Sequence, residues 1–180
     1  MKSCDQNESQ TIYEHGVSVR DHLKQLLDYI HEDVPLNETW RVPEWLTENK
    51  ELIRNRLLPS SIVLEYALFH DVGKPQCRIV DDDGRVHFPD HANVSADYWL
   101  ANGGDPQIGR LIRMDMDIHL LKDKGVEEFS KRPECCTLLL AGLAEVHSNA
   151  AMFGGKDSTS FKIKWKQINK RGNAIFKTMI

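Results

Sequence analysis

The amino-acid sequence predicts an all-α helical bundle with one small inserted β-hairpin. Apolar residues recur at helical spacing over most of the 180 residues, and glycine or proline separates the helical stretches. One segment, at about residues 78–88, instead alternates around an Asp-Gly turn, which is a strong hairpin signal. With a hydrophobic fraction of 41%, a chain of this length can form one core without disulfides or structural metals.

The chain is expected to divide into three parts. Residues 1–10 are polar and acidic, which predicts a disordered lead-in and neither a signal nor a transit peptide. Residues 11–155 carry the core, and residues 156–180 form a basic C-terminal helix packed on the same domain. This last part has seven basic residues and one acidic residue, whereas the first 155 residues have 16 basic and 26 acidic ones. The basic helix is either a solvated amphipathic helix or a contact for phosphate or RNA.

Composition also bears on whether the protein contacts a membrane and on its redox compartment. No apolar run approaches the ~20 residues needed to cross a bilayer, so no membrane contact is expected. The four cysteines, Cys4, Cys77, Cys135 and Cys136, show no Cys-x-x-Cys spacing, which favours a reduced, cytoplasmic location.

The first helix is expected from Thr11 to about Tyr29, and His15 lies near its start. An apolar stripe at helical spacing supports it, formed by Ile12, Val19, Leu23, Leu26, Leu27 and Ile30. His22 lies seven residues after His15, nearly two turns along the helix, so the two imidazoles do not reach one metal. An irregular crossover then leads to a short helix at Glu51–Leu58.

The next helix is apolar and ends in the stretch His70-Asp71-Val72-Gly73-Lys74-Pro75, where glycine and proline stop it. An imidazole beside a carboxylate at the end of a buried helix offers one nitrogen and one oxygen ligand on a rigid support, which suits a divalent cation. Lys74 adds a positive donor for a phosphate oxygen. The alternative is a plain helix end, where His70 and Lys74 only complement the helix dipole.

Three more segments complete the predicted core. After the hairpin, a helix opens near His91. A second helix begins at Asp105-Pro106, runs through Met116 and carries Asp115, Asp117 and His119. A charged loop at Lys122–Glu134 precedes the most apolar helix, Cys135–Met152, in which Glu145 is the only acidic residue.

The stretch His70–Pro75 resembles the central doublet of the HD superfamily of metal-dependent phosphohydrolases. It is similar in particular to the HD domain of the CCA-adding tRNA nucleotidyltransferase group. The resemblance covers roughly residues 12 to 150. It includes the segment Arg85–Ala96, which resembles the sequence that follows the doublet in that group, where a histidine opens the helix after the hairpin.

The resemblance implies a metal site formed by His15, His70, Asp71 and a later acidic residue. Asp115 stands where related families commonly have a histidine. It is preferred over Asp117, which is rotated by about 200° on a continuous helix. The superfamily normally has an aspartate on the last core helix, where this chain offers only Glu145. Either Glu145 substitutes for that aspartate, or Asp115 closes the site.

The implied activity is hydrolysis of a phosphomonoester or phosphodiester of a nucleotide or other phosphorylated small molecule. The expected cofactor is a divalent metal, namely Mn²⁺, Mg²⁺, Fe²⁺, Co²⁺ or Ni²⁺, and a carboxylate-rich site favours Mn²⁺ or Mg²⁺ over Zn²⁺. Lys74 and His91 are expected to stabilise the phosphate, with His91 alternatively binding a second metal. The alternatives are a catalytically inactive HD domain that binds nucleotide or RNA, and a structural helical adaptor.

Overall fold

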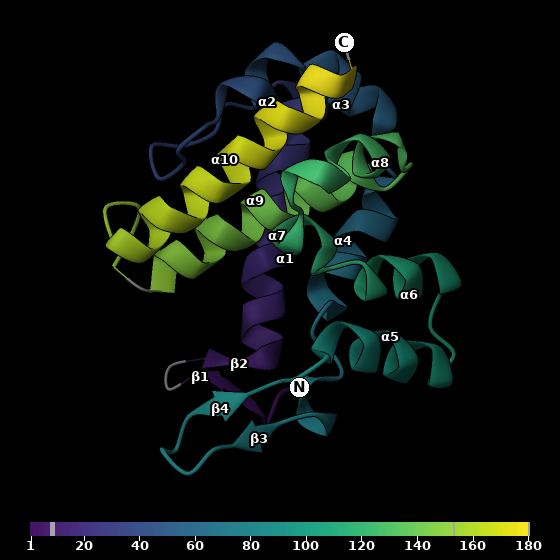
Figure 1. Cartoon of the computed structure of the whole chain (residues 1–180), viewed down its shortest axis with the longest axis vertical. Helices are drawn as coiled ribbons and strands as arrows, with labels where there is room; N and C mark the ends of the chain where they lie inside the picture. Colours follow the sequence, from purple (N-terminus) through teal and green to yellow (C-terminus); the bar gives the residue numbers. More distant parts are fainter. Residues whose placement is uncertain (8–9, 153, 180) are drawn as a thin grey trace.

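Helix α1 (Ile12–Glu32) runs along the long axis of the molecule, and helices α4 (Ser60–Phe69) and α9 (Cys135–Met152) pack against it (Figure 1). The structure is a computed structural model that describes residues 1–7, 10–152 and 154–179. Thr11 caps α1: its hydroxyl accepts the backbone N–H of Glu14, whose carboxylate accepts the backbone N–H of Thr11. The predicted apolar stripe is buried, and α1 ends three residues later than expected.

The remaining helices and strands complete the chain. The helices are α2 (Glu44–Glu48), α3 (Lys50–Arg56), α5 (His91–Ala101), α6 (Pro106–Arg113), α7 (Asp117–Leu120), α8 (Val126–Lys131) and α10 (Thr159–Met179), with short 3-10 turns η1 (Lys74–Gln76) and η2 (Asp123–Gly125). The strands are β1 (Asp5–Asn7), β2 (Gln10–Thr11), β3 (Ile79–Val80) and β4 (Val86–His87).

The predicted all-α class and the inserted hairpin are confirmed. Strands β3 and β4 pair antiparallel, with Ile79 opposite His87 and Val80 opposite Val86. Gly84 has a φ of 78° in the turn, a conformation that favours glycine. The Asp81 carboxylate accepts the backbone N–H of Arg85 at 2.8 Å and thereby closes the loop.

The N-terminal segment differs from the predicted disordered lead-in. Strands β1 and β2 pair antiparallel, and the backbone N–H of Ile12 donates to the carbonyl oxygen of Cys4 at 2.9 Å. The polar composition suggested disorder because it offers little apolar surface to bury. Backbone pairing next to the start of α1 provides the order instead.

The helix predicted from Asp105 through Met116 is interrupted before its acidic residues. α6 ends at Arg113, and the backbone N–H of Met114 is shared between the carbonyl oxygens of Arg110 and Leu111. The resulting turn buries Asp115, whose Oδ1 accepts a hydrogen bond from the hydroxyl of Tyr66 at 2.6 Å. Asp115 and Asp117 therefore do not share one continuous helix.

Two later segments cover the core. Part of the expected loop at Lys122–Glu134 is helix α8, because Val126 and Phe129 lie on one face and are buried. α10 lies against α8 and α9 (Figure 1) and buries Phe161, Ile168, Ile175 and Phe176. All four cysteines are free thiols. Over the described ranges, every helix is too short or too polar to span a bilayer.

Gly16 allows α1 and α4 to approach each other closely. A Cβ atom at this position would overlap the carbonyl oxygen of Leu68. Gly16→Ala is therefore expected to lower the free energy of unfolding by about 1–3 kcal/mol, as overpacking does, and to push His15 away from α4. Urea denaturation measures the loss. Gly125→Ala is the control, because its Cβ would meet only Leu121 Cδ1 at 3.4 Å. Equal stability of the two variants would contradict this account of the contact.

His147 attaches the crossover between α1 and α2 to α9. Its Nε2 accepts the backbone N–H of Arg41 at 3.1 Å, so Nδ1 carries the proton and donates to the carbonyl oxygen of Leu143 at 2.9 Å. The Trp40 ring packs on the imidazole, with 4.2 Å between the ring centroids. Burial lowers the pKa of His147 to about 4, so the folded protein holds it neutral.

This arrangement predicts a loss of stability in mild acid. An unfolded histidine has a pKa near 6.5, so between pH 6.5 and 4 the unfolded chain binds more protons at His147 than the folded chain does. The free energy of unfolding therefore decreases as the pH is lowered through this range. His147 alone is expected to contribute a loss of about 2 kcal/mol by pH 5. The measurement is urea denaturation of the parent and of His147→Gln from pH 7.5 to 5. Stability curves that stay parallel would contradict the assignment.

Candidate metal centre

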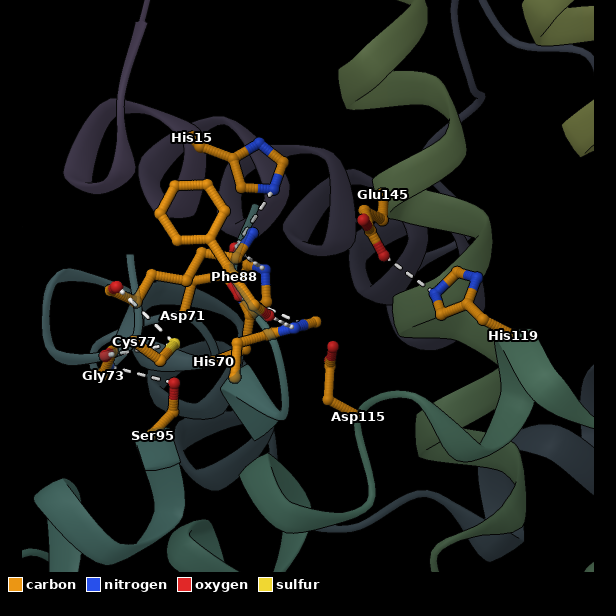
Figure 2. Close-up of polar contacts among 12 residues, drawn as sticks. His15, His70, Asp71, Gly73, Cys77, Phe88, Ser95, Asp115, His119 and Glu145 are labelled. Carbon is orange, nitrogen blue, oxygen red and sulfur yellow. Dashed lines mark hydrogen bonds and ion pairs between the residues drawn. The ribbon is translucent and has the colours of Figure 1, made fainter. Parts of the chain in front are cut away.

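Three predicted ligands come together at the junction of α1 and α4. His15, His70 and Asp71 each offer one ligand atom, and these atoms lie within 4.8 Å of one another. The residues are only 1%, 3% and 1% exposed, respectively. Figure 2 shows His15 reaching from α1 toward Asp71 and His70, which follow α4. Within the part of the chain that the structure describes, this is the one group of three or more such side chains close enough to share an ion.

The local sequence fixes the orientation of the doublet. Val63, Tyr66 and Ala67 bury one face of α4 and hold its C-terminal end in place. His70 Nδ1 lies 2.8 Å from the carbonyl oxygen of Ala67 and donates to it, which leaves Nε2 directed at Asp71 Oδ2, 3.2 Å away. A histidine that ligates a metal through one nitrogen normally donates a hydrogen bond from the other, as His70 does in this site.

Unpartnered buried atoms indicate that a cation fits this cluster. Both ring nitrogens of His15 and Oδ1 of Asp71 are buried and have no hydrogen-bond partner among the described residues. His15 Nε2 lies 3.8 Å from Asp71 Oδ2, which is too far for a hydrogen bond. Leaving a buried polar group unsatisfied costs about 1–3 kcal/mol. Two imidazoles and a carboxylate form a donor set that binds divalent transition metals, so the residues present fit the implied cofactor.

The ligand side chains influence one another's protonation. Burial and the neighbouring His70 lower the pKa of His15 to about 4. Burial also disfavours the charged form of His70, but the carboxylates of Asp71 and Asp115 outweigh it and raise the pKa of His70 to about 10. Burial would raise the pKa of Asp71, yet His70 and Lys74 hold it well below its usual value. His15 is therefore ready to donate a lone pair at neutral pH.

Lys74 and His91, the residues predicted to act on phosphate, both lie at the cluster. Lys74 Nζ lies 2.6 Å from Asp71 Oδ2, and the ring of Phe88 packs near the same ammonium group. His91 Nε2 lies 3.8 Å from Asp71 Oδ1, while His91 Nδ1 contacts the carbonyl oxygen of Phe88 at 3.1 Å. The side chain of His91 is 20% exposed, so it lies on the solvent side of the buried ligands.

The two candidate later ligands are placed differently. Asp115 is buried near His70 and is held by the Tyr66 hydroxyl; burial raises its pKa although His70 opposes this. Glu145 forms an ion pair with His119, with 2.8 Å between Oε2 and Nε2. Neither Asp115 nor Glu145 belongs to the three-residue group. Figure 2 shows Glu145 directed at His119. Glu145 is nevertheless close enough to favour the charged forms of His15 and His70.

Asp117, the less favoured of the two aspartates after α6, lies away from the cluster, and Tyr66 is a site residue that sequence reasoning missed. Asp117 pairs with Arg132 at 2.5 Å and is 41% exposed at its side chain. Tyr66, the partner of Asp115, was not among the predicted site residues. A tyrosine four residues before His70 in an otherwise apolar helix was the available signal, because a buried hydroxyl requires a polar partner.

No known family model matches the chain, and no curated protein or solved structure is significantly similar to it. The resemblance noted from the sequence therefore remains a prediction. Any functional conclusion depends on the geometry of this site.

Proposed function

We propose that the protein is a metal-dependent phosphohydrolase of the HD type, which hydrolyses a phosphomonoester or phosphodiester of a nucleotide-type substrate. The observation that carries the proposal is the buried His15–His70–Asp71 cluster with its unpartnered nitrogen and oxygen atoms. A purely structural cluster would be expected to satisfy such atoms with internal hydrogen bonds.

The metal would be held by His15, by His70 through Nε2, and by Asp71. Asp115 or Glu145 would supply the fourth ligand. Asp115 uses Oδ1 for the Tyr66 hydroxyl and Glu145 uses Oε2 for His119, so each carboxylate would bind the ion through its other oxygen. A divalent ion bound there supplies Lewis-acid chemistry, which polarises a phosphoryl oxygen and makes water more acidic. Mn²⁺, Mg²⁺, Fe²⁺, Co²⁺ and Ni²⁺ all accept such mixed nitrogen and oxygen ligands.

The protein's own groups would bind and orient the phosphate. Lys74, whose ammonium group lies 2.6 Å from Asp71 Oδ2, would neutralise one phosphoryl oxygen. His91 is more exposed and would donate a hydrogen bond to a second oxygen from the helix that follows the hairpin. The ring of Phe88 beside Lys74 would exclude water from one side of the substrate.

The test is phosphate release from a panel of nucleoside monophosphates and 2′,3′-cyclic phosphates. The full chain is first treated with chelator and then reloaded separately with each of the five metals. We expect turnover that depends on added metal and is lost in His70→Ala. His31→Ala is the matched control, because His31 is an exposed histidine at the far end of α1. Metal binding and nucleotide binding without turnover would replace the proposal with a non-catalytic binding domain.

A further inference from the structure

A small cavity lies where α7, α9 and α10 meet, and Glu145 is one of its lining residues. Its volume is about 130 Å³. The polar side chains that line it are His119, Glu145, Asn149, Lys164, Gln167 and Arg171. Figure 2 shows Glu145, one of the lining residues, between the His15–His70 side of the site and His119.

The charges around this cavity do not balance. Glu145 and His119 face each other in an ion pair, with 2.8 Å between Oε2 and Nε2. Lys164 and Arg171 remain as two positive charges. Neither forms an ion pair with a carboxylate anywhere in residues 1–7, 10–152 and 154–179.

Arg171 is held in place without being neutralised. Its Nη2 donates to the carbonyl oxygen of His119 at 2.6 Å, and its Nε donates to the carbonyl oxygen of Leu121 at 3.3 Å. These neutral acceptors fix the guanidinium group and leave its charge uncompensated. A preorganised guanidinium group beside an ammonium group and two amide side chains is a donor set for an oxyanion.

The size of the cavity limits what can enter it. Pockets that enclose a drug-sized ligand have volumes of about 300–1,000 Å³. A cavity of about 130 Å³ is therefore too small for a nucleoside but can accept a single phosphate or carboxylate group. Its position beside Glu145 suits a substrate that reaches past the metal centre.

We propose that Lys164 and Arg171 bind a second anionic group of the substrate, a phosphate or carboxylate remote from the bond that is cleaved. The inference deepens the proposed function and rests on it for the identity of the site as a phosphohydrolase centre. It narrows the substrate class to phosphate esters that carry another anion, such as a nucleoside bisphosphate. Lys164 and Arg171 would then determine specificity.

The direct test is an NMR titration of the metal-free full chain with inorganic phosphate. We expect saturable shifts of the amide signals of Asn149, Gln167 and Arg171, with affinity weakened about tenfold in Lys164→Gln. Lys166→Gln is the matched control, because it removes the same charge from the same helix at an exposed position outside the cavity. Arg171→Gln should weaken binding further. Lys164→Gln keeps the test valid if Arg171→Gln does not fold.

Kinetics separate this inference from the proposed function. With metal-loaded protein, Lys164→Gln should raise the KM for a nucleoside bisphosphate about tenfold relative to a monophosphate and leave kcat nearly unchanged. The absence of saturable shifts at the cavity, or equal phosphate affinities for Lys164→Gln and Lys166→Gln, would overturn the inference even if the monophosphate is hydrolysed. Anion binding at the cavity in a chain without turnover would instead contradict only the proposed function.

Discussion

Asp71→Asn is expected to abolish stoichiometric metal binding and to reduce phosphate release by about a thousandfold or more. Asparagine keeps the shape of the side chain but removes its negative charge. That charge lies 2.6 Å from Lys74 Nζ and 3.2 Å from His70 Nε2, and it is the one carboxylate in the three-residue cluster. A rate loss of this size corresponds to about 4 kcal/mol, which is in the range expected for removing the charged ligand of a catalytic metal.

Asp117→Asn is the matched control for this prediction. Asp117 is the aspartate that ranks below Asp115 as a ligand on the sequence alone, and it pairs with Arg132 at the surface. Its replacement should leave metal content and turnover within about twofold of the parent. Elemental analysis and initial rates measure both quantities, with circular dichroism to establish that each variant is folded. Full activity in Asp71→Asn, or its loss in Asp117→Asn, would show that the ligand assignment is wrong.

The second large effect is on the stability of His15→Leu, which is expected to change in opposite directions without and with metal. Without metal, this variant is expected to be more stable than the parent by about 1–3 kcal/mol, because it removes two buried nitrogens that have no hydrogen-bond partner. Leucine is similar in volume and has a better helix propensity for α1. Such a result would indicate that His15 serves metal binding at the expense of the stability of the metal-free protein.

Adding metal should reverse the order of stability. A metal present at about 1,000 times its Kd stabilises the parent by about 4 kcal/mol, whereas His15→Leu should gain little because one ligand is missing. Urea denaturation with and without Mn²⁺ measures both changes. His31→Leu, on the exposed end of the same helix, should respond to metal as the parent does. A metal-free His15→Leu that is less stable than the parent would mean that His15 has a structural role.

Local sequence patterns were sufficient to predict most of the helices and the hairpin. The apolar stripe of α1, the Asp-Gly turn and the apolar run of α9 each depend on residues that are near one another in the chain. The break between α6 and α7 could not be predicted in this way. It accompanies the burial of Asp115 against Tyr66, 49 residues earlier.

Only the part of the site that is contiguous in sequence could be predicted from local patterns. His70 and Asp71 are adjacent in sequence, whereas the ligand role of His15 was implied by the resemblance to the HD superfamily and not by any local pattern. The pairing of Glu145 with His119 and the position of Arg171 depend on how α7 and α10 cross α9. Hydrophobic periodicity identifies which face of each helix is buried but not which polar side chains meet across a crossing.

The most direct test of a metal-binding cluster is anomalous X-ray diffraction at the manganese absorption edge from crystals of the Mn²⁺-loaded chain. The account predicts an anomalous peak within about 2.0–2.6 Å of His15, His70 Nε2 and Asp71, with a carboxylate of Asp115 or Glu145 as a further ligand. A well-ordered cluster with no peak, or manganese bound only elsewhere, would contradict the central claim that these buried residues hold a metal.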